Sequence, residues 1–531
     1  MKTATALLAL ICIAGTHVST VRAEVPTTPV PTTPVPTTPV PTTPVPTTPV
    51  PTTPVITAPV ITAPVITSAA FHFDGILGTS ADFTFVAAST QAAERAERVA
   101  LAEIERLRRV LSSWDDQSEL SQLFTTGALE HPSAELRDVL NQYTAWNARA
   151  DRAYSARVGE LATVWRAAAL RGTTPTAEET ARLAREIAAP AWRVDGTRIV
   201  ALTTHRVDLN SLGKGFIIDR ALQAVRDSVP ELRGALINIG GDIHVWGTPA
   251  SGGSWTVAVA DPARHADNAA PMTTLAIHGG AVSSSGDYER GFTIGTQHYS
   301  HIFDPRTGRP VDHVTGVTVV APDNATANAL ATTLSVLSPA QGLALAAATP
   351  GVEAMLVTAD GAVRRTAGFA RLERRSPARH DAAVAPLITA KLAIDVTPTV
   401  ANRHQPFVAV WITDTTGKHV RTLAFWGDKP KYLHEMSKWW GLNKGDQPLI
   451  DAITRATRPV GKYSLEWDGL DQKGAAAPAG PYMFWLEVAF EDGAHSAKSV
   501  TVACGKGPVA AAIPTASAFT GADVSCDAGK K

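Results

Sequence analysis

Four short segments between residues 200 and 335 each place glycine beside polar side chains that could bind or activate a ligand. They are DLNSLGKG (208–215), NIGGD (238–242), SSSGDYER (283–290) and HIFDPRTG (301–308). Glycine lets a backbone approach a ligand closely or turn through positive φ. Each segment alone is also an ordinary turn. Their recurrence at strand ends nevertheless predicts one cleft lined by loops.

The segment 207–220, VDLNSLGKGFIIDR, carries the strongest indication of phosphate binding. It predicts a strand end at 207–209, a polar turn at Asn210 and Ser211, and a glycine-flanked lysine, Lys214, entering a helix. Backbone N–H groups, a helix N-terminus and an ammonium group together favour phosphate. No Ser or Thr follows Lys214, so a Walker A loop is not indicated. An ordinary strand–turn–helix with a solvated lysine fits the same residues.

The elements that must position these segments follow from the spacing of apolar residues. The pattern predicts a hairpin at 71–86 and short strands across 193–320. It predicts helices at 91–111, 134–148, 176–188 and 214–227, one beginning near 325, and one at 340–348. We therefore expect an α+β fold in which helices pack on a mixed or antiparallel sheet.

The last quarter of the chain is all-β in character and predicts an immunoglobulin-like sandwich. FVAVWITD and HVRTLAFW read as one hairpin, and YSLEWDGLDQKG and PAGPYMFWLEVAF as a second. Cys504 and Cys526 near the end of the chain fit either a disulfide or two free thiols on a mobile tail.

The chain of 531 residues is long enough for two or three domains. Residues 1–23 read as a cleaved secretory signal, and the PTTPV repeats within 24–69 as a polyproline II linker. The predicted order continues with an α+β domain at 70–375, a linker at 376–390, the sandwich at 391–505 and a flexible tail at 506–531. We expect no transmembrane segment, and an exported protein that is periplasmic or associated with the cell envelope. The net charge of −1 gives no reason to expect a nucleic-acid partner.

Taken in order, the motifs of the α+β region resemble those of the ApbE-type FAD:protein FMN transferases. The matching pieces are ILGT, LSSWDDQSELSQL, DLNSLGKGFIIDRA, LINIGGDIHVWG, SSSGDYER, HIFDPRTGRPV and ANALATTLSVL. The resemblance implies cleavage of the FAD pyrophosphate with Mg²⁺, transfer of FMN to a Ser or Thr of an exported acceptor protein, and release of AMP. The sandwich resembles a domain of unassigned function often found behind ApbE modules. Its WDGLDQKG…PAGPY stretch is also similar to the Ig-like part of flagellar hook-capping proteins.

The same resemblance implies a role for each matching residue. His301 is the candidate general base, although a lone histidine beside a strand can also be structural. Lys214 is implied for catalysis and for the FAD phosphates. The implied FAD contacts are Leu77, Trp114, Ala153, Tyr154, Ser155, Asp208, Lys214 and Ile302. The implied metal ligands are Ser211 through its carbonyl, Asn328 and Thr332.

This sequence departs from the family pattern at the metal site. Asn328 stands where the family has Asp, which removes a negative charge that Mg²⁺ favours, and Asp323 lies five residues back, a poor replacement on a helix. Ser155 stands where Asp is usual. The alternatives are therefore a non-catalytic periplasmic flavin-binding or scaffold protein, or an FAD pyrophosphatase that releases FMN and AMP. Self-modification at Thr520 is a further idea. The acceptor and the oligomeric state do not follow from the sequence.

Overall fold

The computed structural model of the chain leaves out several segments. The described residues are 66–264, 266–286, 291–374, 388–400, 405–427, 435–444, 454–455, 458, 460–491, 493–505 and 507–528. The predicted signal and repeat segments lie outside them, as do most of the predicted linker and the second half of SSSGDYER. No helix in the part of the chain that the structure describes is long and apolar enough to cross a bilayer.

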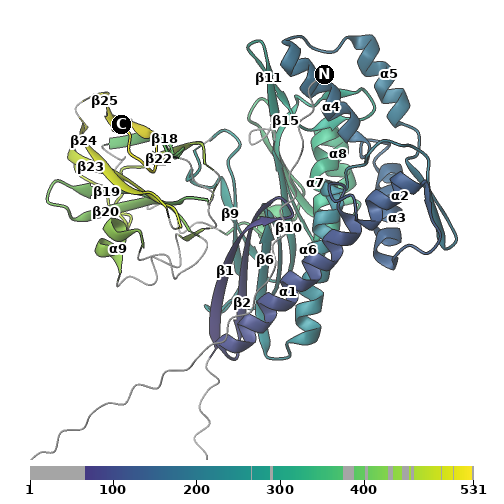
Figure 1. Cartoon of the computed structure of the whole chain (residues 1–531), viewed down its shortest axis with the longest axis horizontal. Helices are drawn as coiled ribbons and strands as arrows, with labels where there is room; N and C mark the ends of the chain where they lie inside the picture. Colours follow the sequence, from purple (N-terminus) through teal and green to yellow (C-terminus); the bar gives the residue numbers. More distant parts are fainter. Residues whose placement is uncertain are drawn as a thin grey trace, which may run out of the picture. The chain divides into compact units, whose positions relative to one another are not determined.

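An eight-stranded sheet forms the centre of the first domain (Figure 1). Its spatial order is β1 (Thr67–Ile76), β2 (Thr79–Ala87), β6 (Leu232–Ile239), β7 (Asp242–Gly247), β10 (Gly280–Gly286), β15 (Val314–Ala321), β16 (Glu353–Thr358) and β17 (Val363–Arg365). Every neighbouring pair is antiparallel. The predicted α+β class is confirmed, and its sheet is antiparallel rather than mixed.

Three helices cover one face of this sheet: α1 (Thr90–Leu111), α6 (Asn210–Ser228) and α7 (Asn324–Val336). Figure 1 shows α1 and α6 beside each other over β1, β2 and β6. The contact face of α1 is rich in alanine, with Ala92, Ala96 and Ala100 fully buried. Small side chains let the two helices approach closely, so the sequence of α1 sets the position of α6.

The opposite face of the sheet has its own, smaller apolar layer. Val86, Val245 and Val282 point to this face and pack against Trp255 and Phe369. Trp255 lies in the hairpin of β8 (Trp255–Val259) and β9 (Thr273–Ile277), and Phe369 in the 3₁₀ turn Phe369–Arg371. Burial on both faces makes the sheet a rigid support for the loops at its ends.

The remaining elements of the first domain surround the ends of these three helices. The helices are α2 (Glu119–Thr126), α3 (Ala134–Arg149), α4 (Val158–Arg171), α5 (Ala177–Ile187) and α8 (Pro339–Ala347). The short strands are β3 (Ala128–Leu129), β4 (Trp192–Asp195), β5 (Arg198–Ala201), β11 (Gly291–Ile294), β12 (Gln297–Ser300), β13 (Phe303–Asp304) and β14 (Arg309–Pro310). The helices predicted in this domain are confirmed, with ends within a few residues of the predicted ones. Helices α2 and α4 were not predicted.

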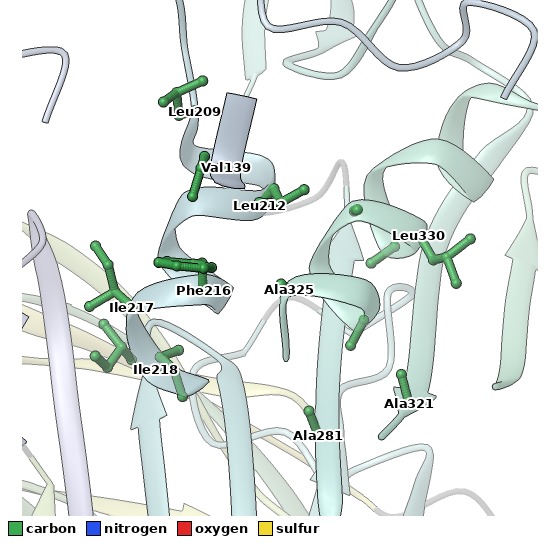
Figure 2. Close-up of a cluster of buried hydrophobic side chains, with 14 of the residues drawn as sticks. Val139, Leu209, Leu212, Phe216, Ile217, Ile218, Ala281, Ala321, Ala325 and Leu330 are labelled. Atoms are coloured by element: carbon green, nitrogen blue, oxygen red, sulfur yellow. The ribbon is translucent and has the colours of Figure 1, made fainter. Parts of the chain in front are cut away.

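Helices α6 and α7 share one buried cluster. Figure 2 shows Phe216, Ile217 and Ile218 of α6 grouped with Ala325 and Leu330 of α7. These side chains are all less than a tenth exposed. Because both helices bear the predicted site residues, this cluster also fixes the site.

The contact between α6 and α7 requires glycine at one position. A Cβ at Gly215 would lie 2.5 Å from the carbonyl oxygen of Asn324, which is backbone and cannot swing away. By contrast, a Cβ at Gly213 would meet only the Cβ of Leu209, at 3.4 Å. Of these two neighbouring glycines, therefore, only Gly215 is needed for packing.

We predict that Gly215→Ala lowers the free energy of unfolding by about 1–3 kcal/mol, because the added methyl forces the helices apart. Gly213→Ala is the matched control and should leave the stability unchanged or raise it, since alanine is the better helix former. Urea denaturation of both variants measures the difference. Equal stability of the two would contradict the packing argument.

The second domain is a two-sheet sandwich, as predicted. One sheet has the order β22 (Lys462–Trp467), β18 (Ile388–Asp395), β26 (Gly521–Ala528), β25 (Val509–Ile513). The other has the order β21 (Thr454–Arg455), β20 (His419–Trp426), β19 (Phe407–Asp414), β23 (Gly480–Ala489), β24 (His495–Cys504). A short helix, α9 (Ser437–Asn443), packs on the second sheet through Trp439.

The sequence predicted two hairpins in the sandwich. The first is confirmed, since β19 pairs with β20. The second is wrong, because β22 pairs with β18 and β23 pairs with β19, in opposite sheets. The predicted flexible tail also contains two strands, β25 and β26, because β26 completes the sheet beside β18.

The two late cysteines belong to this sandwich rather than to a mobile tail. Cys504 ends β24, Cys526 lies in β26, and the two form a disulfide. The alternative of two free thiols is therefore wrong. Thr520, the residue considered for self-modification, precedes β26, and its hydroxyl donates to the carbonyl oxygen of Thr397 at 3.0 Å.

Candidate active site

One cleft, with a volume of about 280 Å³, gathers all but two of the residues assigned from the sequence. Residues of α6 and α7 line it, together with residues of β10 and of the loops that connect the other elements. Those present are Ala153, Tyr154, Ser155, Asp208, Ser211, Lys214, His301, Ile302, Asn328 and Thr332. Segments separated by more than 100 residues thus meet at one place. The recurring glycine-containing turns predicted such a cleft, and the resemblance implied the individual residues.

The segment that introduces Lys214 is more helical than the sequence suggested. Residues 206–209 form no strand, and α6 already begins at Asn210, so Lys214 and its flanking glycines lie inside the helix. The predicted polar turn is wrong because Asn210 and Ser211 already belong to α6. The carboxylate of Asp208, just before the helix, accepts the Asn210 N–H at 2.8 Å. Lys214 therefore projects from a rigid helix rather than from a loop.

The ammonium group of Lys214 forms an ion pair that the sequence reading did not assign. Its Nζ lies 2.5 Å from Oδ2 of Asp242, whose side chain is 6% exposed. Asp242 ends the NIGGD segment and also lines the cleft. A bound phosphate must share Lys214 with this carboxylate or displace it. The signal in the sequence was a carboxylate directly after two glycines.

Asp208 is a second carboxylate of the cleft, and burial raises its pKa above the ordinary value. The hydrogen bond from the Asn210 N–H and the charge of Arg166 act in the opposite direction but are smaller effects. Removing a charged carboxylate from water is costly without a paired cation. A hydrogen-bond donor on a ligand would therefore stabilise the ionised carboxylate of Asp208.

The hydroxyl of Ser211 is held by two stacked tyrosines. The rings of Tyr143 and Tyr154 lie 5.0 Å apart, and each phenol oxygen is 3.0 Å from the Ser211 Oγ. Burial raises the pKa of both phenols, so they remain neutral. The hydroxyl of Ser211 is thus engaged within the protein, and the role of its carbonyl oxygen as a metal ligand stays a prediction.

The start of α7 is fixed by carboxylates on two sides. Asp219 of α6 accepts the N–H groups of Asn324 at 2.8 Å and of Ala325 at 2.9 Å. Asp323 caps the helix, accepting the N–H of Thr326 at 2.7 Å. Asp323 is thus engaged as a cap and does not replace the missing carboxylate at position 328.

The chemistry of the donor set fits a hard divalent cation. Asn328 and Thr332 lie four residues apart on α7, and with Ser211 they line the cleft beside two carboxylates, Asp208 and Asp242. Amide, hydroxyl, carbonyl and carboxylate oxygens are the ligands that Mg²⁺ takes. Among the described residues, no three His, Cys, Asp or Glu side chains are grouped to hold a metal. A site held by Ser211, Asn328 and Thr332 would use neutral oxygen ligands.

His301 and Ile302 reach the cleft from the loop between β12 and β13. Ile302 is 9% exposed, and its N–H donates to the Ser300 Oγ at 3.1 Å. His301 is exposed. This places an accessible imidazole at the edge of the same cleft as Lys214, where it can accept a proton from an incoming hydroxyl group.

Leu77 and Trp114 are the two predicted residues that do not line this cleft. Leu77 lies in the β1–β2 turn with φ of 50° and packs on the main core. Trp114 is 72% exposed, and the guanidinium of Arg206 lies 5.2 Å from its ring centre. Their contact with a flavin stays a prediction.

The chain matches two families and several relatives. The ApbE family matches residues 77–356, and the family described as "Predicted periplasmic protein (DUF2271)" matches residues 389–519. The FAD:protein FMN transferase of Treponema pallidum is 34% identical over 173 residues, 31% of this chain and 47% of the relative. That of Klebsiella pneumoniae is 32% identical over 212 residues, 39% of this chain and 64% of the relative. The chain thus spans about half to two thirds of these relatives' length.

The fold is also similar to a solved structure. The crystal structure of the ApbE protein of Thermotoga maritima superposes with a TM-score of 0.51 at 25% identity. The match covers 58% of this chain and 100% of that chain. The residues that line the cleft therefore lie in the region shared with the family.

Burial of Asp208 has a consequence for stability that can be measured. The pKa of Asp208 is higher in the folded chain than in the unfolded one. Its contribution to the free energy of unfolding is therefore most favourable below the unfolded pKa and declines as the pH rises through the folded pKa. We predict that Asp208→Asn, which keeps the acceptor oxygen, raises the free energy of unfolding near neutral pH. The gain should shrink as the pH falls towards about 4, the ordinary aspartate range.

Denaturation with urea across this pH range provides the measurement. The control is Asp116→Asn, on an aspartate with a largely exposed side chain. A variant at position 208 that is less stable than the parent at neutral pH would contradict the prediction.

Proposed function

This chain belongs to the ApbE family, and from that premise we propose that it is an FAD:protein FMN transferase. The proposal is that FAD is the substrate, that FMN is transferred to a Ser or Thr hydroxyl of an acceptor protein, and that AMP is released. The named activity of the relatives supports it. The single observation that carries it is the meeting of Lys214, Asp208, His301 and the Asn328–Thr332 pair in one cleft.

The proposed reaction is a displacement at phosphorus. The hydroxyl oxygen of the acceptor attacks the phosphorus on the riboflavin side of the pyrophosphate, and the bond from that phosphorus to the bridging oxygen breaks. AMP leaves with this oxygen, and the hydroxyl proton passes to a base. Catalysis of such a step consists mostly of positioning and charge stabilisation.

The residues of the cleft fit these tasks. Lys214 projects from α6 and stabilises phosphate charge, with Asp242 holding its ammonium group in place before the substrate arrives. His301 at the mouth takes the proton of the acceptor hydroxyl. Asp208, whose pKa is raised by burial, accepts a hydrogen bond from the nucleotide.

We further propose that Mg²⁺ binds between α6 and α7, held by Ser211, Asn328 and Thr332. When bound, the ion neutralises charge on the pyrophosphate oxygens. The protein's own contribution is to orient its oxygen donors, which the Asp219 contacts to Asn324 and Ala325 do by fixing α7. Asn328 supplies an oxygen without charge, so we expect weak metal affinity.

Export to the periplasm or cell envelope is part of the proposal. The buried disulfide of Cys504 and Cys526 supports it, because disulfides persist in oxidising compartments. The match of residues 389–519 to a family described as periplasmic agrees with this. The acceptor would then also be an exported protein.

Asn328 favours one second candidate, a flavin-binding protein without turnover. The experiment that separates the two is incubation of the full chain with FAD and an acceptor domain, with and without Mg²⁺. Metal-dependent release of AMP and an FMN-sized mass gain of the acceptor support the transferase. AMP without any mass gain indicates a pyrophosphatase, and the absence of both would sink the proposed activity.

Restoring the carboxylate at position 328 tests the metal site. We predict that Asn328→Asp lowers the Mg²⁺ concentration needed for half-maximal AMP release by at least about tenfold, because affinity follows the charge of the ligands. Gln341→Glu, at an exposed position of α8 outside the cleft lining, is the control for added charge. An unchanged Mg²⁺ requirement at position 328 would place the ion elsewhere.

A further inference from the structure

A second cavity, of about 480 Å³, adjoins the candidate active site and is lined by arginines. Arg152 follows α3, Arg185 lies on α5, and Arg306 and Arg309 belong to the β13–β14 turn. We call this cavity the arginine pocket. No Asp or Glu is among the residues that line it.

The positive charge of the arginine pocket is largely unbalanced. Arg306 is paired with Asp304, whose hydrogen bonds raise the arginine's pKa. Among the residues that the structure describes, Arg152, Arg185 and Arg309 form no ion pair. The chain as a whole carries a net charge of −1, so the pocket is a local excess and not part of a generally basic protein.

Three arginines of the same domain that lie outside the pocket are paired with carboxylates. Arg95 pairs with Glu231 at 2.6 Å, Arg157 with Glu160 at 2.7 Å, and Arg182 with Glu186 at 2.8 Å. Arg182 is one turn from Arg185 on α5 but does not line the pocket. Unpaired guanidinium groups that face one cavity favour an anionic ligand, because guanidinium matches carboxylate and phosphate geometry.

The arginine pocket and the active-site cleft share a lining residue. Ser155 lines both cavities. The loop that carries His301 and Ile302 into the cleft carries Arg306 and Arg309 into the pocket a few residues later. An extended peptide covers about 3.3–3.6 Å per residue, so a segment of a few residues is enough to reach from one cavity to the other.

The backbone at Arg152 helps to choose a variant. Asp151 and Arg152 have φ of 46° and 62°, the left-handed region that side chains rarely adopt. Asparagine tolerates this conformation well. Arg152→Asn therefore removes the charge while keeping the local backbone.

We propose that the arginine pocket binds an acidic segment of the acceptor protein, next to the Ser or Thr that is modified. This inference rests on the proposed function, because it names the partner of the same site. The guanidinium groups recognise Asp and Glu side chains on the acceptor and so select which hydroxyl reaches His301.

The test uses the full chain and two labelled synthetic peptides with one central Thr, flanked either by Asp and Glu or by Asn and Gln. Binding is followed by fluorescence anisotropy at low and high salt. We expect the acidic peptide to bind about tenfold more tightly at low salt, with the preference lost at high salt as screening grows. In the double variant Arg152→Asn/Arg185→Ala the preference should fall to about twofold or less, whereas Arg182→Ala, the matched control, should keep it.

Three results would overturn the proposal. The first is equal binding of both peptides by the parent chain, and the second is equal behaviour of the double variant and Arg182→Ala. The third is displacement of the acidic peptide by saturating FAD, together with equally weakened FAD binding in the double variant, which would assign the pocket to FAD. AMP release in the presence of FAD, Mg²⁺ and the acceptor domain is measured in parallel. Its absence contradicts the proposed activity and leaves the binding result standing, so the two failures are distinguishable.

Discussion

The candidate site depends on the contact between α6 and α7. Gly215 allows the helices to approach, and Asp219 accepts the first N–H groups of α7. The Nδ1 of His244 on β7 lies 2.6 Å from the same carboxylate of Asp219, which ties this contact to the central sheet. As a result Ser211 and Lys214 on one helix, and Asn328 and Thr332 on the other, have fixed positions around one cleft. Preorganised polar groups of this kind need little rearrangement when charge develops on a substrate.

Lys214 already has an ionic partner in the cleft, because its ammonium group pairs with Asp242. Burial raises the pKa of Asp208, a second carboxylate there. An anionic substrate can therefore replace one partner of Lys214 by another rather than enter a site of uncompensated charge. Asparagine rather than aspartate at position 328 also changes the charge of the cleft, because it lowers the negative charge available to a cation. The arginine pocket differs, because among the described residues only Arg306 of its four arginines has such a partner, Asp304.

The sequence predicted the fold class, most helices and the sandwich, because these follow from apolar periodicity and from turn residues. It missed α4, whose buried Leu161, Trp165 and Ala168 do follow a helical spacing. It misplaced the start of α6, because glycines flanking Lys214 resemble a turn when the helix that packs on Gly215 is not known. The prediction that β22 pairs with β23 was wrong for a similar reason, since alternation of apolar residues predicts strands but not their partners. The roles of site residues came from family resemblance. Asp242 was missed because its importance lies in a contact to Lys214, which no local pattern encodes.

The central claim is that the cleft between α6 and α7 binds the FAD pyrophosphate through Lys214. The most direct measurement is the affinity for FAD, from the quenching of flavin fluorescence, in the parent chain, in Lys214→Ala and in Arg220→Ala. Arg220 is exposed on the same helix and does not line the cleft, so it controls for the loss of one positive charge. The account predicts that Lys214→Ala weakens FAD binding by about tenfold or more, the loss of roughly one charge-assisted contact, while Arg220→Ala has little effect. Equal affinity in all three proteins would contradict it.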